Sequence, residues 1–267
     1  MKLSRFLILP ATALLLAGCA IDDSPTENRR PDGLSAVRFI HAMSDEGAVD
    51  ARMYDQTEWS SYALGINYRQ SGAFHPTESG ARTIRVFRAS TDINEIDDIL
   101  IDQTVTIPPG EDAVTLLLTG SVQGGTANIQ VLTAAVPDSV SGSVHFRAFN
   151  TGSEAREVVF TDGGGSTAPV SVGPLSSTGY SVRGVAAGAL TASFHDAADP
   201  GTVWSGNAPA GAPQNGGIGA TAGHTASGSA LAAFLFEPAV VGSRAPQDLV
   251  DPTVIWFVDR VPAPPRF

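Results

Sequence analysis

The sequence predicts an all-β protein built from two tandem immunoglobulin-like β-sandwich domains. Three observations predict this class. Apolar and polar residues alternate over short segments, clusters of Gly, Pro, Asn and Asp separate those segments, and the second half of the chain repeats the first. No segment beyond the N-terminal region shows apolar periodicity typical of a helix of three turns.

Residues 1–18 have the layout of a secretory signal peptide. Lys2 and Arg5 supply two positive charges, and residues 6–16 are almost wholly apolar. This apolar run is too short to span a membrane as a helix, which takes about 20 residues. We therefore expect export from the cytoplasm and removal of this segment.

The only cysteine, Cys19, follows the apolar run directly. The stretch Leu16-Ala17-Gly18-Cys19 resembles the lipobox of bacterial lipoproteins. The resemblance implies a diacylglycerol on the Cys19 thiol, cleavage before Cys19 and acylation of the new amine. Several acyl chains on one residue suffice for stable anchoring, because each buried CH₂ contributes about 0.8 kcal/mol. The alternative is an ordinary signal peptide with a chance cysteine, which leaves a soluble protein with a free thiol.

Residues 19–34 form the lipidated N-terminus and a polar tether without apolar periodicity. Ala20 follows the cysteine, where an aspartate favours inner-membrane retention in enteric bacteria. The resemblance therefore implies a cell-envelope protein anchored in the outer membrane. Whether it faces the periplasm or the cell surface is left open.

Charge and cysteine content exclude several classes of partner. After loss of the signal peptide, 14 basic residues of the original 16 remain against 27 acidic ones, a net charge of −13. Such a field repels nucleic acid, so we expect no nucleic-acid partner. A single cysteine excludes disulfides and multi-cysteine metal sites within one chain.

An internal repeat divides the chain. Residues 36–55 align without gaps with residues 143–162, so that Phe39 meets Phe146 and Asp55 meets Asp162. Similar turns and apolar runs follow in the same order in both halves. We predict a first domain over residues 35–137 and a second over residues 138–267.

Each expected strand is inferred from apolar residues that recur at every second position. Alternation predicts strands at residues 49–53, 104–107, 114–119 and 254–258. In residues 114–119, Leu117 departs from the alternation, because it is apolar where a polar residue is expected.

The stretch "VRFIHAMSDEGAVDARMYD", residues 37–55, resembles the opening of the domain of unknown function family 4397. The residues that carry the resemblance include Val37, Arg38, Phe39, His41, Asp45 and Asp50. The resemblance implies an envelope β-sandwich and no reaction. The second copy departs from the pattern, since Ala148 stands where His41 stands in the first.

His41, Asp45 and Asp50 form one candidate site in the first repeat. An imidazole with two carboxylates is suited to metal binding or acid–base chemistry. The alternative is structural, with Asp45 capping the turn and His41 or Asp50 satisfying a strand end. We expect the structural role.

An acidic stretch at residues 91–103 is the first choice for an ion site, with calcium as the ion. Calcium takes six to eight oxygen ligands. The candidate ligands are Asp92, Glu95, Asp97, Asp98 and Asp102. The alternative is a solvated acidic loop, because the spacing does not match an EF-hand. We expect no other cofactor.

These observations favour a non-catalytic, lipid-anchored envelope protein that serves binding, adhesion or envelope assembly. Its expected partners are the membrane, through Cys19, and an envelope protein or glycan. The alternative is a hydrolase acting on envelope polysaccharide or peptide, which needs a carboxylate pair or a nucleophile beside a base. The sequence supplies carboxylates without such an arrangement.

Overall fold

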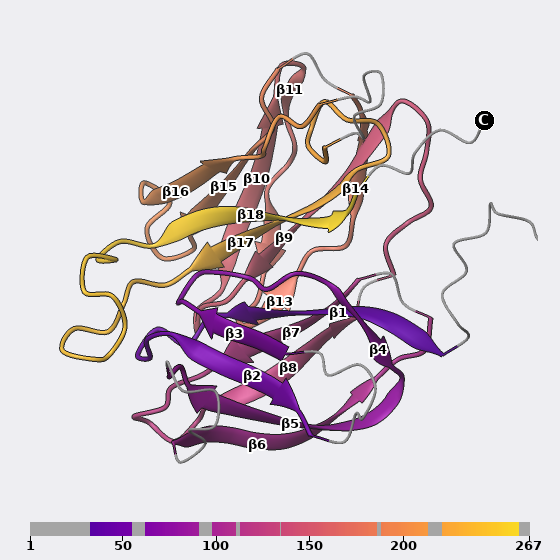
Figure 1. Ribbon diagram of the computed structural model, residues 1–267. Coiled ribbons are helices and arrows are strands. Elements are labelled where there is room, and N and C mark those ends of the chain that lie inside the picture. Colours follow the sequence, from indigo (N-terminus) through magenta and orange to yellow (C-terminus); the bar gives the residue numbers. More distant parts are fainter. Residues whose placement is uncertain are drawn as a thin grey trace, which may run out of the picture. The chain divides into compact units, whose positions relative to one another are not determined.

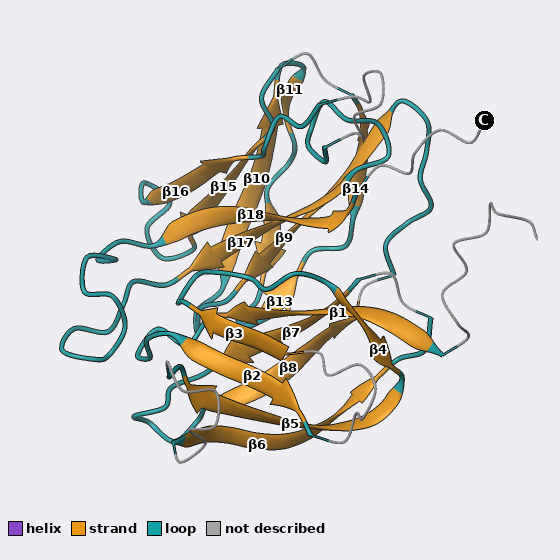
Figure 2. Ribbon diagram, viewed as in Figure 1, coloured by secondary structure: helices purple, strands orange, loops and turns teal. Residues whose placement is uncertain are grey.

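The computed structural model consists of strands and loops, without a helix among the residues that it describes (Figure 2). Those residues are 33–54, 62–90, 98–110, 113–133, 135–185, 188–212 and 221–261. The chain divides into two compact units, residues 1–30 and 31–267, and the described residues all belong to the second. The signal peptide, the lipobox residues Leu16, Ala17 and Gly18, and Cys19 lie outside the described residues.

The strands of the first half form two four-stranded sheets (Figure 1). Their bounds are β1 Leu34–His41, β2 Val49–Met53, β3 Tyr62–Ile66, β4 His75–Glu78, β5 Gly80–Arg88, β6 Ile99–Ile107, β7 Val114–Thr119 and β8 Asn128–Thr133. One sheet has the order β4-β1-β7-β8 and the other has the order β3-β2-β5-β6. The strands predicted at residues 49–53, 104–107 and 114–119 are confirmed as β2, part of β6 and β7.

The strands of the second half form two five-stranded sheets. Their bounds are β9 Ser143–Asn150, β10 Arg156–Asp162, β11 Gly165–Ser166, β12 Val170–Val172, β13 Ser176–Ser177, β14 Ser181–Gly184, β15 Thr191–Asp196, β16 Val203–Asn207, β17 Ala230–Phe236 and β18 Thr253–Arg260. One sheet has the order β13-β9-β17-β18 with β14 beside β9, and the other has the order β11-β10-β15-β16 with β12 beside β10. The strand predicted at residues 254–258 lies within β18.

Both halves use the same pairing at their centre. Strand β1 pairs in parallel with β7, which places Phe39 opposite Leu116, and β9 pairs in parallel with β17, which places Phe146 opposite Leu231. The sequence repeat therefore corresponds to a repeated strand order. The boundary predicted between residues 137 and 138 falls in the link between β8 and β9, and it stays a prediction.

The all-β class and the sandwich arrangement are confirmed, whereas the strand order is not that of an immunoglobulin domain. Constant-type immunoglobulin domains place their first two strands in one sheet, in the order A-B-E-D. Here β1 and β2 lie in different sheets, and β1 pairs with β4 and β7. Period-two alternation reveals strands but not their neighbours, so the sequence could not distinguish the two orders.

Three apolar cores hold the described residues together. The first lies inside the first sandwich and includes Phe39 and Leu116, and the second lies inside the other sandwich and includes Phe146 and Leu231. The third, here called the shared core, draws on both halves. It consists of Ile40, Ala42, Tyr68, Leu117, Leu132, Phe149, Ala232, Phe234 and Phe236.

The shared core explains the composition of the central strands. In β17 every residue is buried, because Leu231 and Leu235 point into one core while Phe234 and Phe236 point into the other. Every residue of β7 is also buried, and Leu117 belongs to the shared core. A strand buried on both faces is expected to be continuously apolar. The departure from alternation at Leu117 therefore reflects burial of β7 on both faces.

Candidate functional site

His41 is fully buried at the end of β1 and serves the turn that follows. Its Nε2 lies 2.7 Å from the Gly47 carbonyl oxygen, and its Nδ1 accepts a hydrogen bond from the Met43 N–H at 3.2 Å. These partners assign the proton to Nε2. Burial lowers the pKa of His41 to about 4, although the Gly47 carbonyl opposes this effect. Both ring nitrogens are thus used within the turn.

Asp45 ties the turn after β1 to the loop after β7. Its carboxylate accepts hydrogen bonds from the Ser121 hydroxyl at 2.6 Å and from the backbone N–H groups of Val122 at 3.1 Å and Gln123 at 2.8 Å. Burial acts to raise the pKa of Asp45, but these bonds to the charged form outweigh it, and the pKa is lowered. Asp45 is therefore negatively charged, and its carboxylate holds the turn after β1 against the loop after β7.

Asp50 supports an irregular point in the pairing of β2 with β3. Its Oδ1 accepts a hydrogen bond from the Gly65 N–H at 2.7 Å, and Gly65 has a φ of 62°. The register between these strands shifts at this position. A glycine suits the left-handed conformation that the shift imposes. Asp50 therefore fixes backbone geometry.

The three candidate groups point to separate structural partners rather than to a common ligand. Among the described residues, no three His, Cys, Asp or Glu side chains gather as metal ligands. The buried carboxylate of Glu46, which the sequence analysis did not single out, also has structural partners. It lies 3.2 Å from Arg88 Nε and 3.0 Å from Arg244 Nε.

Two of the proposed calcium ligands are paired with arginines. Asp98 lies 2.8 Å from Arg88 Nη1, and Asp102 lies 2.8 Å from Arg85 Nε. Both carboxylates are more than 40 % exposed. The other candidate ligands, Asp92, Glu95 and Asp97, lie outside the described residues. The calcium site stays a prediction.

Arg38 of the family signature is buried between the two halves. Its Nη2 donates to Asp259 Oδ1 at 2.5 Å, its Nη1 to the Val258 carbonyl at 2.7 Å and its Nε to Thr115 Oγ1 at 3.0 Å. Val37 and Phe39 on either side point into the first core. The signature thus supplies core residues on one face of β1 and a buried cation on the other.

Asp259 also serves residues of the second half. Arg147 Nε donates to Asp259 Oδ2 at 2.9 Å, and the Tyr180 hydroxyl donates to the same oxygen at 2.5 Å. Burial and the Asp259 charge raise the pKa of Tyr180. Neither Arg147 nor Asp259 was predicted from the sequence. The available signal was a charged residue inside an apolar strand, as in "VHFRAFN" and "VIWFVDRV".

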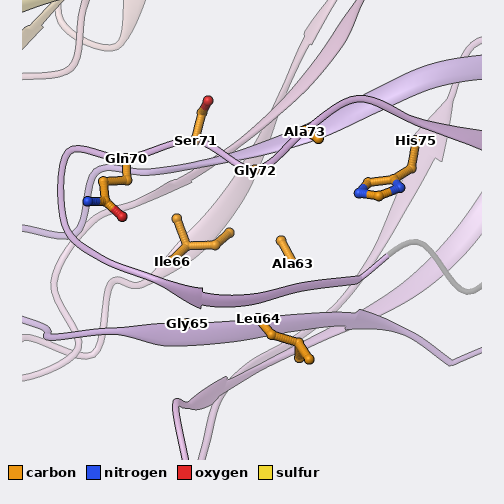
Figure 3. A pocket seen from close by; sticks show the side chains of 9 residues that line it. All are labelled: Ala63, Leu64, Gly65, Ile66, Gln70, Ser71, Gly72, Ala73 and His75. Carbon is orange, nitrogen blue, oxygen red and sulfur yellow. The ribbon is translucent and has the colours of Figure 1, made fainter.

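A cavity of about 270 Å³ lies beside the edge strand β3 (Figure 3). Figure 3 shows the side chains of Gln70 and His75 toward opposite ends of the cavity, with Ile66 and Ala63 between them. The lining contains hydrogen-bonding groups but neither a carboxylate nor a guanidinium. It therefore lacks the pair of carboxylates by which a glycosidase acts.

The described residues form no helix that is long and apolar enough to cross a membrane. The fold of these residues places the protein in the class of all-β proteins with two β-sandwiches. Within this class, residues 35–161 match the family model of the domain of unknown function DUF4397. The resemblance predicted from residues 37–55 is thereby confirmed.

No curated protein matches the chain. Among solved structures, the chain is similar to the fimbrial anchor protein Mfa2 from Porphyromonas gingivalis, at 7 % identity and a TM-score of 0.22, with 85 % of this chain and 98 % of the other covered. It is also similar to a leucine-rich repeat protein from Bacteroides thetaiotaomicron, at 11 % identity and a TM-score of 0.18, covering 72 % of this chain and 23 % of the other. Likeness at this level carries no argument about function.

Proposed function

We propose that the protein is a non-catalytic, lipid-anchored component of the cell envelope that binds an envelope partner. The anchor is Cys19, and the outer membrane is the expected location. The binding surface is the set of loops at the end of the body where β1, β7, β9 and β17 finish, here called the distal loops: residues 42–48, 120–127, 151–155 and 237–252.

The observation that carries the proposal is the loop at residues 237–252. The Val240 N–H donates to the Ser44 carbonyl at 2.8 Å, and the Arg244 N–H donates to the Asp45 carbonyl at 3.3 Å. The loop between β17 and β18 is thus fastened to the turn after β1, which Asp45 in turn fastens to the loop after β7. Loops of both halves are joined into one surface.

This loop is ordered by its own side chains. Gln247 Nε2 donates to the carbonyls of Val240, Ser243 and Ala245, and its Oε1 accepts from the Gly242 N–H at 2.8 Å. At the tip, Val241 is 91 % exposed. An apolar side chain held on a pre-ordered loop is typical of binding surfaces, because less conformational entropy is lost on association.

The position of the loop also supports the proposal. The described chain enters β1 at Leu34, and the turn that holds the loop begins after His41, at the other end of this strand. In Figure 1 the start of β1 is at the right and the loop between β17 and β18 is at the left. The loop therefore lies at the end of the sandwiches opposite to the start of β1.

Site-specific photo-crosslinking in cells tests the proposal. A photo-reactive residue at position 241 should give a discrete crosslinked product. The matched control is position 182, where a valine that is 58 % exposed lies beside the start of β9. Equal products at both positions, or none at position 241, would contradict binding through the distal loops. Hydrolysis of an envelope polysaccharide or peptide by the purified protein would contradict the non-catalytic part.

A further inference from the structure

A second cavity, of about 260 Å³, lies at the seam between the two sandwiches. Gln130 and neighbouring residues of β8 line it from the first half, and Arg147, Phe149 and Ser177 line it from the second. Its volume is slightly below the range of roughly 300–1,000 Å³ typical of ligand pockets. A ligand of this cavity is therefore small.

Arg147 lines this cavity and shares its acidic partner with Arg38, which is not one of the lining residues. Arg38 and Arg147 are each 3 % exposed, and both pair with the single carboxylate of Asp259. Among the described residues neither guanidinium has another acidic partner. The Tyr180 hydroxyl also donates to this carboxylate, which leaves less of its hydrogen-bonding capacity for Arg147. One cationic charge is thus left without a counter-charge, which is unfavourable in a buried position.

Two buried polar atoms at the cavity have unused hydrogen-bonding capacity. Arg147 Nη2 lies 2.9 Å from Asp259 Oδ2 in an ion pair, but it makes no hydrogen bond within the part of the chain that the structure describes. Gln130 donates through Nε2 to the Leu175 carbonyl at 2.9 Å, while its Oε1 accepts no hydrogen bond from any described residue. One unused group is a cationic donor and the other is a neutral acceptor.

The side chain of Gln130 is oriented by a hydrogen bond to Leu175, whose backbone conformation is strained. Leu175 has a φ of 47°, a left-handed conformation that is uncommon for a branched side chain. Its carbonyl is the one that receives the Gln130 Nε2 hydrogen bond. This bond fixes which end of the Gln130 amide is left for a ligand, because Nε2 is already committed.

We propose that this cavity, here called the seam site, binds a small carboxylate that also carries a hydroxyl or N–H group, such as a sugar acid or a hydroxy acid. The carboxylate accepts from Arg147, whose guanidinium matches carboxylate geometry. The hydroxyl or N–H donates to Gln130 Oε1, and the ring of Phe149 contacts the carbon skeleton. The seam site is separate from the distal loops and does not depend on the proposed function.

Isothermal titration calorimetry of the mature full-length protein tests the seam site with three probes. Glucuronate carries both a carboxylate and hydroxyls, acetate carries only the carboxylate, and glucose carries only hydroxyls. We expect glucuronate to bind at least about tenfold more tightly than acetate, since it satisfies one more buried group. We expect no measurable binding of glucose. Failure of glucuronate to bind, or equal binding of glucose, would overturn the proposal.

Substitutions of Gln130 test whether the ligand binds in this cavity, and they do not remove a buried charge. Gln130→Glu places a carboxylate in the wall beside Arg147 and should abolish binding of both anions. Gln130→Met removes Oε1 and should lower glucuronate affinity about tenfold, to the level of acetate. The matched control is Gln70→Met, which changes a glutamine of the other cavity and should leave glucuronate affinity unchanged. Circular dichroism checks that each variant is folded. Wild-type affinity in both folded Gln130 variants would refute the assignment.

Discussion

Arg38 and Asp259 are 221 residues apart in the sequence and form an ion pair of 2.5 Å between β1 and β18. Each side chain is at most 3 % exposed. The pair joins the first strand of the described body to the last, and Arg147 of β9 contacts the same carboxylate. Together with the shared core, this contact connects the two repeats.

Asp259→Asn should destabilise the whole body. The substitution leaves two buried guanidinium groups without a counter-ion, and loss of one partner of a buried pair costs about 3–5 kcal/mol. Urea denaturation followed by circular dichroism measures the loss. The control is Asp102→Asn, which breaks the exposed pair with Arg85 and should cost less than about 1 kcal/mol. Similar losses for the two variants would contradict a special role for Asp259.

Truncating the shared core should have a comparable effect. Phe234 is fully buried, stacks on Phe149 at a centroid distance of 5.1 Å and contacts Phe257. Phe234→Ala should lower the free energy of unfolding by about 3–5 kcal/mol. Amide hydrogen exchange should show faster exchange in strands of both halves, including β1 and β7. Faster exchange confined to β17 and β18 would argue that the sandwiches unfold separately.

Residues 35–137 expressed alone should not reach the stability of the full body. The fragment exposes Ile40, Leu117 and Leu132 of the shared core and leaves Arg38 without Asp259. We expect aggregation or a broad unfolding transition at low urea concentration. A sharp transition with the midpoint of the intact chain would show that the first sandwich is an independent module.

His41 should make stability depend on pH in the acidic range. Its folded-state pKa of about 4 lies below the ordinary value of 6.5, so the unfolded chain takes up a proton first as the pH falls. The stabilising contribution is present above pH 6.5 and is lost as the pH falls toward 4. Its full size is about 3 kcal/mol. His41→Gln should reduce the slope of unfolding free energy against pH in this window. An unchanged slope in His41→Gln would contradict a neutral buried imidazole.

Lipidation at Cys19 is tested by palmitate labelling of cells that express the wild type or Cys19→Ser. We expect label and membrane partition for the wild type and neither for the variant. The contribution of about 0.8 kcal/mol per buried CH₂ makes the acyl chains sufficient for this difference. Membrane partition of the unlabelled variant would refute anchoring through this thiol.

The sequence by itself determined the all-β class, the positions of four strands and the repeat of the two halves. These features depend on local patterns: alternation reveals a strand, and matched segments such as those around Phe39 and Phe146 reveal a repeat. The lipobox and the family signature are likewise local. His41, Asp45 and Asp50 could be selected as notable residues from such patterns, but their partners could not.

Tertiary structure alone decided which strands pair, which faces are buried and which charges meet. The seam between the sandwiches brings Gln130 beside Arg147, and Arg38 to Asp259, across long stretches of chain. A period of two shows that a residue shares a face with its second neighbour, but it carries no information on what covers that face. Contacts between distant segments depend on the packing of whole sheets, which is a property of the complete fold.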